Sequence, residues 1–330
     1  MWPHLMLIVR TPVRVSFCGG GTDLPAFYKN SDEGGLVTSV ALDAYIYVTV
    51  NKRFDNAIRV SYSQTENVED FEDLQHELVR EAMRLTGVTS GIEITTIADI
   101  PGQGTGLGSS SSVTVGLLHA LHVYAGRKVT AQQLAEEACR IEIDVLGQPI
   151  GKQDQYAAAF GGLNQIRFNS DESVDVIPLD PTASSALGDN FCLVWTGLTR
   201  KASSILEQQS RNTASKMEQL GVMRAQAEQV SGLIESGDFS AIGELLGNTW
   251  ELKRTLADGI SNPEIDQIYD QLMQFGCTGG KLLGAGGGGF VLVQTPPNVQ
   301  QKITTTLANK VIPLNPDLHG STLILDDRGE

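Results

Sequence analysis

Cysteine, basic residues and long apolar runs are all scarce in this chain of 330 residues. The four cysteines are scattered, with no Cys-x-x-Cys pair and no histidine cluster beside them, so neither a disulfide framework nor a structural zinc is expected. A reducing, cytoplasmic location fits this usage. No apolar run approaches the roughly eighteen residues of a membrane span. The apolar start lacks a small-residue cleavage site, so it predicts a first strand and not a signal peptide.

Lysine and arginine number 24 against 39 aspartates and glutamates, which gives a formal net charge of -15. Phosphate backbones are bound by basic surfaces, so we expect no nucleic-acid partner. A small phosphorylated ligand is not excluded, because a local cluster of donors and a metal ion can outweigh the field of the whole chain.

Apolar periodicity predicts mixed strands and helices, without an internal repeat or a low-complexity linker. Strands are predicted near residues 6–15, 36–50, 58–63, 91–100 and 191–197, with a hairpin from GGLNQIRF and VDVIPL and a last strand STLILD. Helices are predicted near residues 72–86, 111–124, 131–146, 202–235, 239–256 and 297–309. Because long polar helices dominate after residue 190, we place a domain boundary near residue 188, giving domains 1–188 and 189–330.

A loop rich in glycine and serine, PGQGTGLGSSSS, comes directly before a predicted helix. Glycines leave backbone N–H groups uncovered, and at a helix N-terminus such groups bind anions, usually phosphate. The serine hydroxyls add donors, or ligands for the Mg²⁺ that accompanies a nucleotide. The simpler alternative is a turn in which Ser109 or Ser110 only caps the helix. The candidate nucleotide-binding residues are Pro101, Gly102, Gly104, Gly106, Leu107, Gly108, Ser109, Ser110, Ser111 and Ser112.

Two familiar phosphate-binding motifs are absent from this loop. The P-loop needs a lysine, and none lies between Val88 and Gly126. The dinucleotide fingerprint needs glycines at its first, third and sixth positions. Counted from each of the first three glycines of the loop, the sixth residue is Leu107, Ser109 or Ser111. Neither motif fits.

The loop instead resembles the second motif of the GHMP kinases, the galactokinase, homoserine, mevalonate and phosphomevalonate kinase family, whose core reads P-x-x-x-G-L-G-S-S. RTPVRVSFCGGGTDLP (Arg10–Pro25) resembles the first motif, KLLGAGGGGFVLV (Lys281–Val293) the third, and EIDVLGQPIGKQDQYAAAFGG the acidic segment of the sugar kinases. The resemblance implies an α+β, two-domain fold. It would have an N-terminal mixed α/β domain, a C-terminal ferredoxin-like domain and the active site in the cleft between them.

Within the family, three segments are most similar to those of the bacterial D-glycero-D-manno-heptose 7-phosphate kinases. They are GGGTD, GLGSSSS and PIGKQDQYAAAFGGLN. This implies a kinase that uses ATP and Mg²⁺ to phosphorylate the anomeric hydroxyl, giving the 1,7-bisphosphate. Galactokinases have Gly-Glu-His-Thr-Asp at the positions of Gly19–Asp23, so Gly20 and Gly21 argue against galactose. The alternatives are another aldose, a mevalonate-type alcohol, or a non-catalytic sugar or ATP sensor. We expect no membrane partner and leave a homodimer open.

Phosphoryl transfer to a hydroxyl needs an oriented oxygen, an acceptor for its proton and positive charge near the phosphate. By resemblance, Asp154 in GKQDQ matches the acidic residue that faces the acceptor hydroxyl, so we predict it to be the general base. Arg14 matches the basic residue of the first motif, and beside Asp154 it would keep the carboxylate ionised. The simpler alternatives are a helix-capping aspartate and a solvent-facing arginine.

Glu142 lies twelve residues before Asp154, the distance that the resemblance implies for the Mg²⁺ carboxylate. At about 100° per residue it also falls at the edge of an apolar stripe, whereas Glu136 falls on the opposite side. The stripe consists of Leu134, Ala138, Ile141 and Val145. A carboxylate at a buried edge needs a partner, and a hard cation is suited to it. Ser110 is the predicted second ligand, and Ser109 or Ser111 could exchange roles with it.

By resemblance, Asp23 binds sugar hydroxyls, a role that suits a carboxylate with two acceptor oxygens; an aspartate ending a glycine turn is the alternative. The third motif predicts a tight turn that either contacts the ligand or only packs. A phosphate on the substrate would need cations, drawn from TRK (Thr199–Lys201), Lys253, Arg254 and Lys281. The predicted substrate-binding residues are Gly20, Gly21, Thr22, Asp23, Asp154, Arg200, Lys201, Lys281, Gly286 and Gly287.

Overall fold

The computed structural model describes residues 6–101, 104–199, 203–307 and 310–327. Its larger sheet has eight strands, and its main path runs in the order β12-β1-β2-β5-β3-β4. Its strands are β1 Met6–Cys18, β2 Gly35–Lys52, β3 Ile58–Ser61, β4 Thr65–Val68, β5 Ile92–Ala98, β6 Leu163–Phe168, β7 Val174–Pro178 and β12 Thr322–Asp326. β6 and β7 form the predicted hairpin, which joins the sheet through pairing of β6 with β2.

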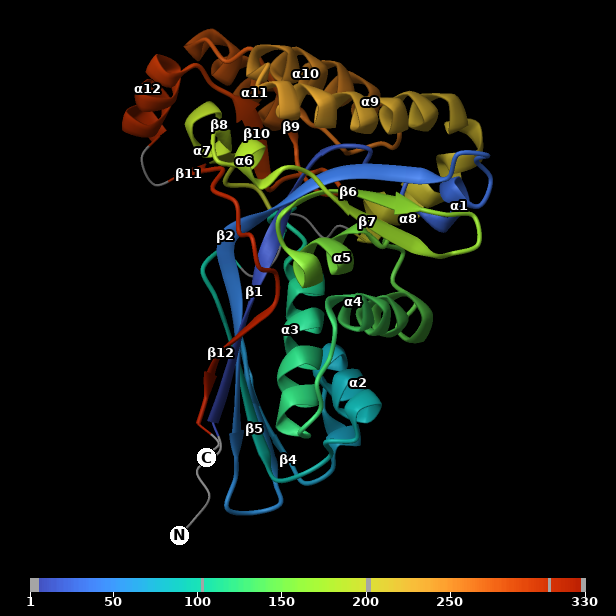
Figure 1. Ribbon diagram of the computed structural model, residues 1–330, viewed down its shortest axis with the longest axis vertical. Helices are drawn as coiled ribbons and strands as arrows, with labels where there is room; N and C mark the ends of the chain where they lie inside the picture. Colours follow the sequence, from blue (N-terminus) through green and yellow to red (C-terminus); the bar gives the residue numbers. More distant parts are fainter. Residues whose placement is uncertain (1–5, 102–103, 200–202, 308–309, 328–330) are drawn as a thin grey trace.

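β2 is long enough to take part in two halves of this sheet. Residues 46–52 of β2 pair with β5, residues 35–40 pair with β6, and β1 runs antiparallel along both halves. β1 changes register between Pro12 and Val13 and between Ser16 and Cys18, and such bulges bend a strand. The bent pair crosses the middle of the molecule (Figure 1), and it places Arg14 between these two bulges.

Helices cover one face of the larger sheet (Figure 1). They are α2 Glu77–Thr86, α3 Ser109–Tyr124, α4 Ala131–Cys139 and α5 Gln153–Phe160. α3 is buried along most of its length and packs on β1 and β2. Gly116 permits this close approach, because a Cβ atom there would lie 2.9 Å from Thr11 Oγ1 and 3.0 Å from Val48 Cγ2. The N-terminus of α3 is thereby fixed beside β1.

The second sheet has four antiparallel strands in the order β11-β8-β10-β9: β8 Phe191–Trp195, β9 Gly279–Leu282, β10 Phe290–Gln294 and β11 Val311–Pro313. The longer helices of this part are α8 Ser203–Asn212, α9 Met217–Ser236, α10 Phe239–Arg254, α11 Pro263–Phe275 and α12 Pro297–Leu307. Two short helices, α6 Pro181–Ser184 and α7 Leu187–Asn190, precede β8, and a third, α1 Pro25–Tyr28, lies between β1 and β2. α10 packs on β9 and β10, and α9 packs on both α10 and β2. Within the described ranges, no helix is both long and apolar enough to cross a membrane.

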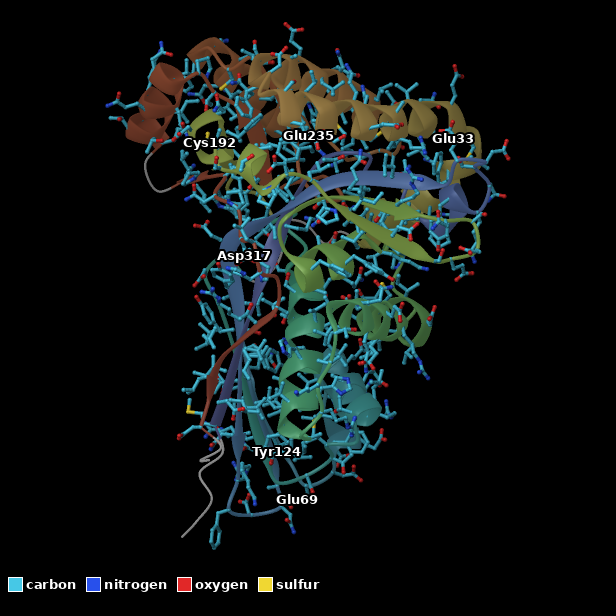
Figure 2. The ribbon with its side chains drawn as sticks, viewed as in Figure 1. Glu33, Glu69, Tyr124, Cys192, Glu235 and Asp317 are labelled. Atoms are coloured by element: carbon cyan, nitrogen blue, oxygen red, sulfur yellow. The ribbon has the colours of Figure 1, made fainter. Side chains whose placement is uncertain are left out.

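One buried cluster joins the two sheets, and it includes Val13 of β1, Leu107 of the glycine loop and Leu283 after β9. The end of the chain also crosses back to the larger sheet. Asp317, labelled near the middle of Figure 2, accepts a hydrogen bond from Tyr45 Oη at 2.9 Å, and β12 then pairs with β1. A division at residue 188 therefore separates the two sheets except for β12, which lies in the larger one.

Three predicted helices differ from the structure. The helix predicted at 131–146 becomes a π-helix over Arg140–Val145, and Val145, predicted on the buried stripe, is 53% exposed. The wider π turn explains this, because spacing of about 100° per residue no longer applies. The helix predicted at 202–235 breaks between α8 and α9, where Lys216 has non-helical φ and ψ of -118° and 15°. α11 was not predicted, and α2 begins at Glu77 because Leu74 is extended.

Candidate active site

Arg14 and Asp154, which are 140 residues apart in the sequence, form a two-pronged ion pair at the junction of the two sheets. Arg14 Nε donates to Asp154 Oδ1 at 2.8 Å and its Nη2 donates to Oδ2 at 2.9 Å. The third nitrogen, Nη1, donates to the carbonyl of Gly106 at 2.6 Å. The side chain of Arg14 is 5% exposed and that of Asp154 is 22% exposed, so the carboxylate is oriented from behind and open on one side.

The carboxylate of Asp154 lies against the N-terminus of α3. Gly108 caps this helix with a φ of 74°, and a Cβ atom there would lie 3.0 Å from Asp154 Oδ2. The loop is also attached to β1, because Arg14 N donates to Leu107 O at 3.0 Å and Ser112 Oγ donates to Pro12 O at 2.8 Å. The free N–H groups of the first helical turn and the base predicted from the sequence therefore face the same space.

The structure distinguishes among the serines of the loop. Ser109, Ser111 and Ser112 are buried, and Ser109 Oγ is 3.1 Å from Thr105 Oγ1. Ser110 is exposed, and its hydroxyl donates to Glu142 Oε1 at 3.0 Å. The sequence allowed Ser109, Ser110 or Ser111 as the second metal ligand. Of these, Ser110 is the exposed residue whose hydroxyl also donates to Glu142. Gly102 lies outside the described residues.

Glu142 is fully buried, and Gln155 Nε2 donates to its other oxygen at 2.7 Å. Burial raises the pKa of Glu142 to about 7, although the hydrogen bonds from Gln155, Ser111 and Ser110 lower it. The described residues contain no group of three or more metal-binding side chains. A buried carboxylate beside one hydroxyl fits a hard cation that takes its other ligands from phosphate and water, so Glu142 and Ser110 would hold Mg²⁺.

Asp23 lies close to the ion pair of Arg14 and Asp154. It is 2% exposed, and its oxygens accept hydrogen bonds from Gly21 N at 2.9 Å and Gln153 N at 3.4 Å. Burial, followed by the charge of Asp154, raises the pKa of Asp23. Gly151 permits this arrangement, because a Cβ atom there would lie 1.9 Å from Asp23 Oδ2. Thr22 is buried and donates to the carbonyls of Gly19 and Leu36, so it holds the turn in place.

The third motif supports the glycine loop from the side of the second sheet. A Cβ atom on Gly284 would lie 2.4 Å from Gly106 Cα, and Phe290 N donates to Thr105 O at 3.0 Å. Gly286 and Gly287, which were predicted to bind substrate, pack on Ile260: a Cβ on Gly286 would lie 2.7 Å from Ile260 Cα, and Gly287 N donates to Ile260 O. Within the protein, this motif therefore packs against the glycine loop and Ile260, and its predicted contact with substrate stays a prediction.

Lysine residues predicted to hold a substrate phosphate have other partners. Lys281 is 2% exposed, and its Nζ donates to Ser16 O at 2.8 Å and Phe17 O at 2.9 Å. Lys253 Nζ donates to Leu282 O at 2.8 Å and Gly284 O at 2.5 Å. Both ammonium groups therefore bind main-chain carbonyls behind the site, a placement that no local pattern predicts. Arg254 pairs with Asp266, and Arg200 and Lys201 lie outside the described residues.

A phosphoryl-transfer enzyme requires a site for phosphate, a site for a cation and an oriented group that accepts a proton. The N-terminus of α3, the buried carboxylate of Glu142 and the carboxylate of Asp154 suit these three requirements. The model for the GHMP kinases N terminal domain matches residues 74–162, and the model for the GHMP kinases C terminal domain matches residues 230–311. The chain belongs to the GHMP kinase family, as its motifs predicted.

Individual relatives agree with the family match. D-glycero-alpha-D-manno-heptose 7-phosphate kinase of Campylobacter jejuni is 29% identical over 317 residues, covering 90% of this chain and 92% of the relative. L-fucokinase/L-fucose-1-P guanylyltransferase of Bacteroides fragilis is 28% identical over 97% of this chain, which spans 38% of that longer protein. A crystal structure of a D-glycero-D-manno-heptose 1-phosphate kinase from Bacteroides thetaiotaomicron has a TM-score of 0.79, with 23% identity over 97% of this chain and 99% of the other. The predicted fold and the predicted enzyme class, a sugar kinase phosphotransferase, are confirmed.

Proposed function

We propose that this enzyme transfers the γ-phosphoryl group of ATP to the anomeric hydroxyl of D-glycero-D-manno-heptose 7-phosphate, giving the 1,7-bisphosphate. The observation that carries this proposal is the position of Asp154, held by Arg14 and placed against Gly108 at the N-terminus of α3. A hydroxyl beside this carboxylate lies next to the place where a nucleotide phosphate would bind. The similarity to the heptose 7-phosphate kinase of Campylobacter jejuni supports this acceptor.

Each residue of the site has a defined task in this reaction. The N–H groups of the loop bind the nucleotide phosphates, and Asp154 accepts the proton of the attacking hydroxyl. Arg14 orients Asp154, while Asp23 accepts hydrogen bonds from hydroxyls of the sugar. Glu142 and Ser110 would hold Mg²⁺, which would neutralise charge on the phosphates.

The experiment that tests this proposal measures ADP release with heptose 7-phosphate, with the free heptose and with a panel of other aldoses. Phosphorus NMR of the product then identifies the phosphorylated position. We expect the highest kcat/KM with heptose 7-phosphate and a new signal from an anomeric phosphate. Equal turnover of heptose and heptose 7-phosphate would count against the 7-phosphate as a recognised group.

A second candidate, a kinase of an unphosphorylated aldose, is favoured by one observation. Lys253 and Lys281 are both occupied by main-chain carbonyls, so they are not available to a phosphate on the sugar. The fucokinase activity in the name of the Bacteroides fragilis relative makes L-fucose the first aldose to include in the panel.

A further inference from the structure

The two glycines that precede Thr22 leave space that two glutamine side chains approach. A Cβ atom on Gly21, whose φ is 96°, would lie 2.4 Å from Gln209 Nε2. A Cβ atom on Gly20 would meet Gln153 Nε2 at 3.9 Å and no other described atom within 4 Å. Gln153 begins α5, whereas Gln209 belongs to α8, beyond the second sheet's first strand. The turn is therefore flanked by amide groups from both parts of the molecule.

Both amides have unused hydrogen-bonding capacity among the described residues. Gln153 Oε1 is buried without a hydrogen-bond partner. Gln209 is 6% exposed, and its backbone carbonyl accepts a hydrogen bond from Thr213 Oγ1, but its side-chain amide has no partner within the described ranges. A buried polar atom without a partner, such as Gln153 Oε1, is destabilising and needs an explanation, and a ligand that hydrogen-bonds to it supplies one.

The chemistry around this turn is rich in hydrogen-bond acceptors. Asp23, Asp154 and Gln153 Oε1 all accept, and Arg14 is already used by Asp154 and Gly106 O. Such a surface binds hydroxyl donors and repels a phosphate. A sugar hydroxyl that donates to a carboxylate still has lone pairs, and these need an N–H donor. Gln209 Nε2, next to Gly21 and hence close to Asp23, supplies one.

We propose that Gln209 is a specificity-determining residue of the sugar subsite, donating from α8 to a hydroxyl of the acceptor that also binds Asp23. This inference rests on the proposed function, because it assumes a sugar acceptor beside Asp154. It adds that α8 contributes to recognition and that the subsite between Gly20, Asp23 and Gln209 takes unphosphorylated hydroxyls. A phosphate carried by the substrate lies outside it.

The test compares Gln209→Met with Gln208→Met. Methionine keeps the length and most of the volume of glutamine but cannot donate a hydrogen bond. Gln208 is the matched control, because it lies on the same helix and its amide donates to Asp258 at 3.2 Å. We expect Gln209→Met to raise the KM for the sugar about tenfold, the size of one lost hydrogen bond, and to change the ranking of aldoses in kcat/KM. The KM for ATP and the melting temperature should stay near the wild-type values, and Gln208→Met should change none of these quantities.

A Gln209→Met enzyme with wild-type KM and wild-type ranking of aldoses would overturn the role of Gln209 while leaving the proposed function intact. A wild-type enzyme that phosphorylates no aldose would overturn the proposed function instead. In that case calorimetric titration with the same aldoses decides the inference. Weaker binding to Gln209→Met than to wild type supports it, and equal binding, or no binding to either protein, overturns it.

Discussion

Gly106 of the glycine loop and Gly284 of the third motif pack backbone against backbone, since a Cβ atom on Gly284 would lie 2.4 Å from Gly106 Cα. Lys253 holds one side of this contact through Gly284 O, and Arg14 holds the other through Gly106 O. Two buried cations therefore bind carbonyls on either side of a glycine pair. The glycine loop is positioned by segments from the whole chain.

Replacing Gly284 by alanine tests this contact. The matched control is Gly126→Ala, because Gly126 has a similar φ of 73° but no heavy atom within 4 Å of its Cβ position, whereas Gly284 has a φ of 66°. Both changes strain the backbone by about 1 kcal/mol. We expect Gly284→Ala to lower the free energy of unfolding by roughly 1–3 kcal/mol more, because backbone must move, and to raise the KM for ATP. Urea unfolding and steady-state kinetics measure both effects, and equal losses in the two variants would contradict the contact.

Asp154→Asn should lower kcat by roughly 10²- to 10⁴-fold, because an amide cannot accept the proton of the sugar hydroxyl. The amide offers only one oxygen to Arg14 and leaves a buried guanidinium without its counter-charge, so the melting temperature should also fall, and kcat is compared at a temperature where the variant is folded. Asp171→Asn, in the exposed turn between β6 and β7, is the control and should retain wild-type kcat. Full activity of Asp154→Asn would remove this residue from the role of base. Absence of activity in the wild type would favour a sensor instead.

Glu142→Gln should change activity and stability in opposite directions. Glutamine keeps the shape of the side chain but binds a cation poorly, so the Mg²⁺ concentration for half-maximal activity should rise roughly 10-fold or more. Without Mg²⁺, removing a fully buried charge should raise the free energy of unfolding at pH 8 by about 1 kcal/mol or more. Glu136→Gln, at an exposed position on α4, should change neither quantity. A variant with wild-type Mg²⁺ dependence would contradict the metal role.

The order of the elements and the location of the loop could be predicted from local patterns, because strand alternation, helical spacing and glycine runs are local signals. The pairing of Arg14 with Asp154 could not, since it depends on the path of β1 and α5 across 140 residues. Only the family resemblance predicted it. Periodicity placed Glu142 at the edge of a buried stripe, but the π-helix that buries it fully was not visible in the spacing.

The positions of the lysines in the sequence did not predict where their charges lie in the fold. Lys253 and Lys281 were interpreted as cations for a substrate phosphate, and both lie buried behind the site. The sequence had no signal for this placement, because a lysine in a strand or helix is usually solvated. Gln209 was overlooked for the opposite reason: a glutamine in a polar helix is unremarkable until the fold places it beside Gly21.

Lys281 should make stability rise with pH above neutrality. Burial, together with the charge of Arg14, lowers the pKa of Lys281 from 10.5 to about 8, although Cys18 raises it in part. Between these two values the unfolded chain binds more protons than the folded one, so the free energy of unfolding increases with pH through this window. Below pH 8 the full penalty of burying the charge is present, on the order of 3 kcal/mol.

Lys281→Met removes this titration, and it also leaves Ser16 O and Phe17 O, at the bulge of β1, without their donor. We expect the variant to be less stable than wild type at pH 7.5, because two unpaired carbonyls cost about 1–3 kcal/mol each and together outweigh the relief of a buried charge. The deficit should widen by pH 10, since only the wild type gains from deprotonation of Lys281. Urea unfolding at both pH values measures it, with Lys128→Met as the control at an exposed lysine. Burial raises the pKa of all four cysteines in the folded state; taking the difference between variant and wild type removes the contribution of Cys139, Cys192 and Cys277, whereas Cys18, whose pKa Lys281 lowers, contributes to the difference. A deficit that stays constant with pH would show that Lys281 does not titrate in this range.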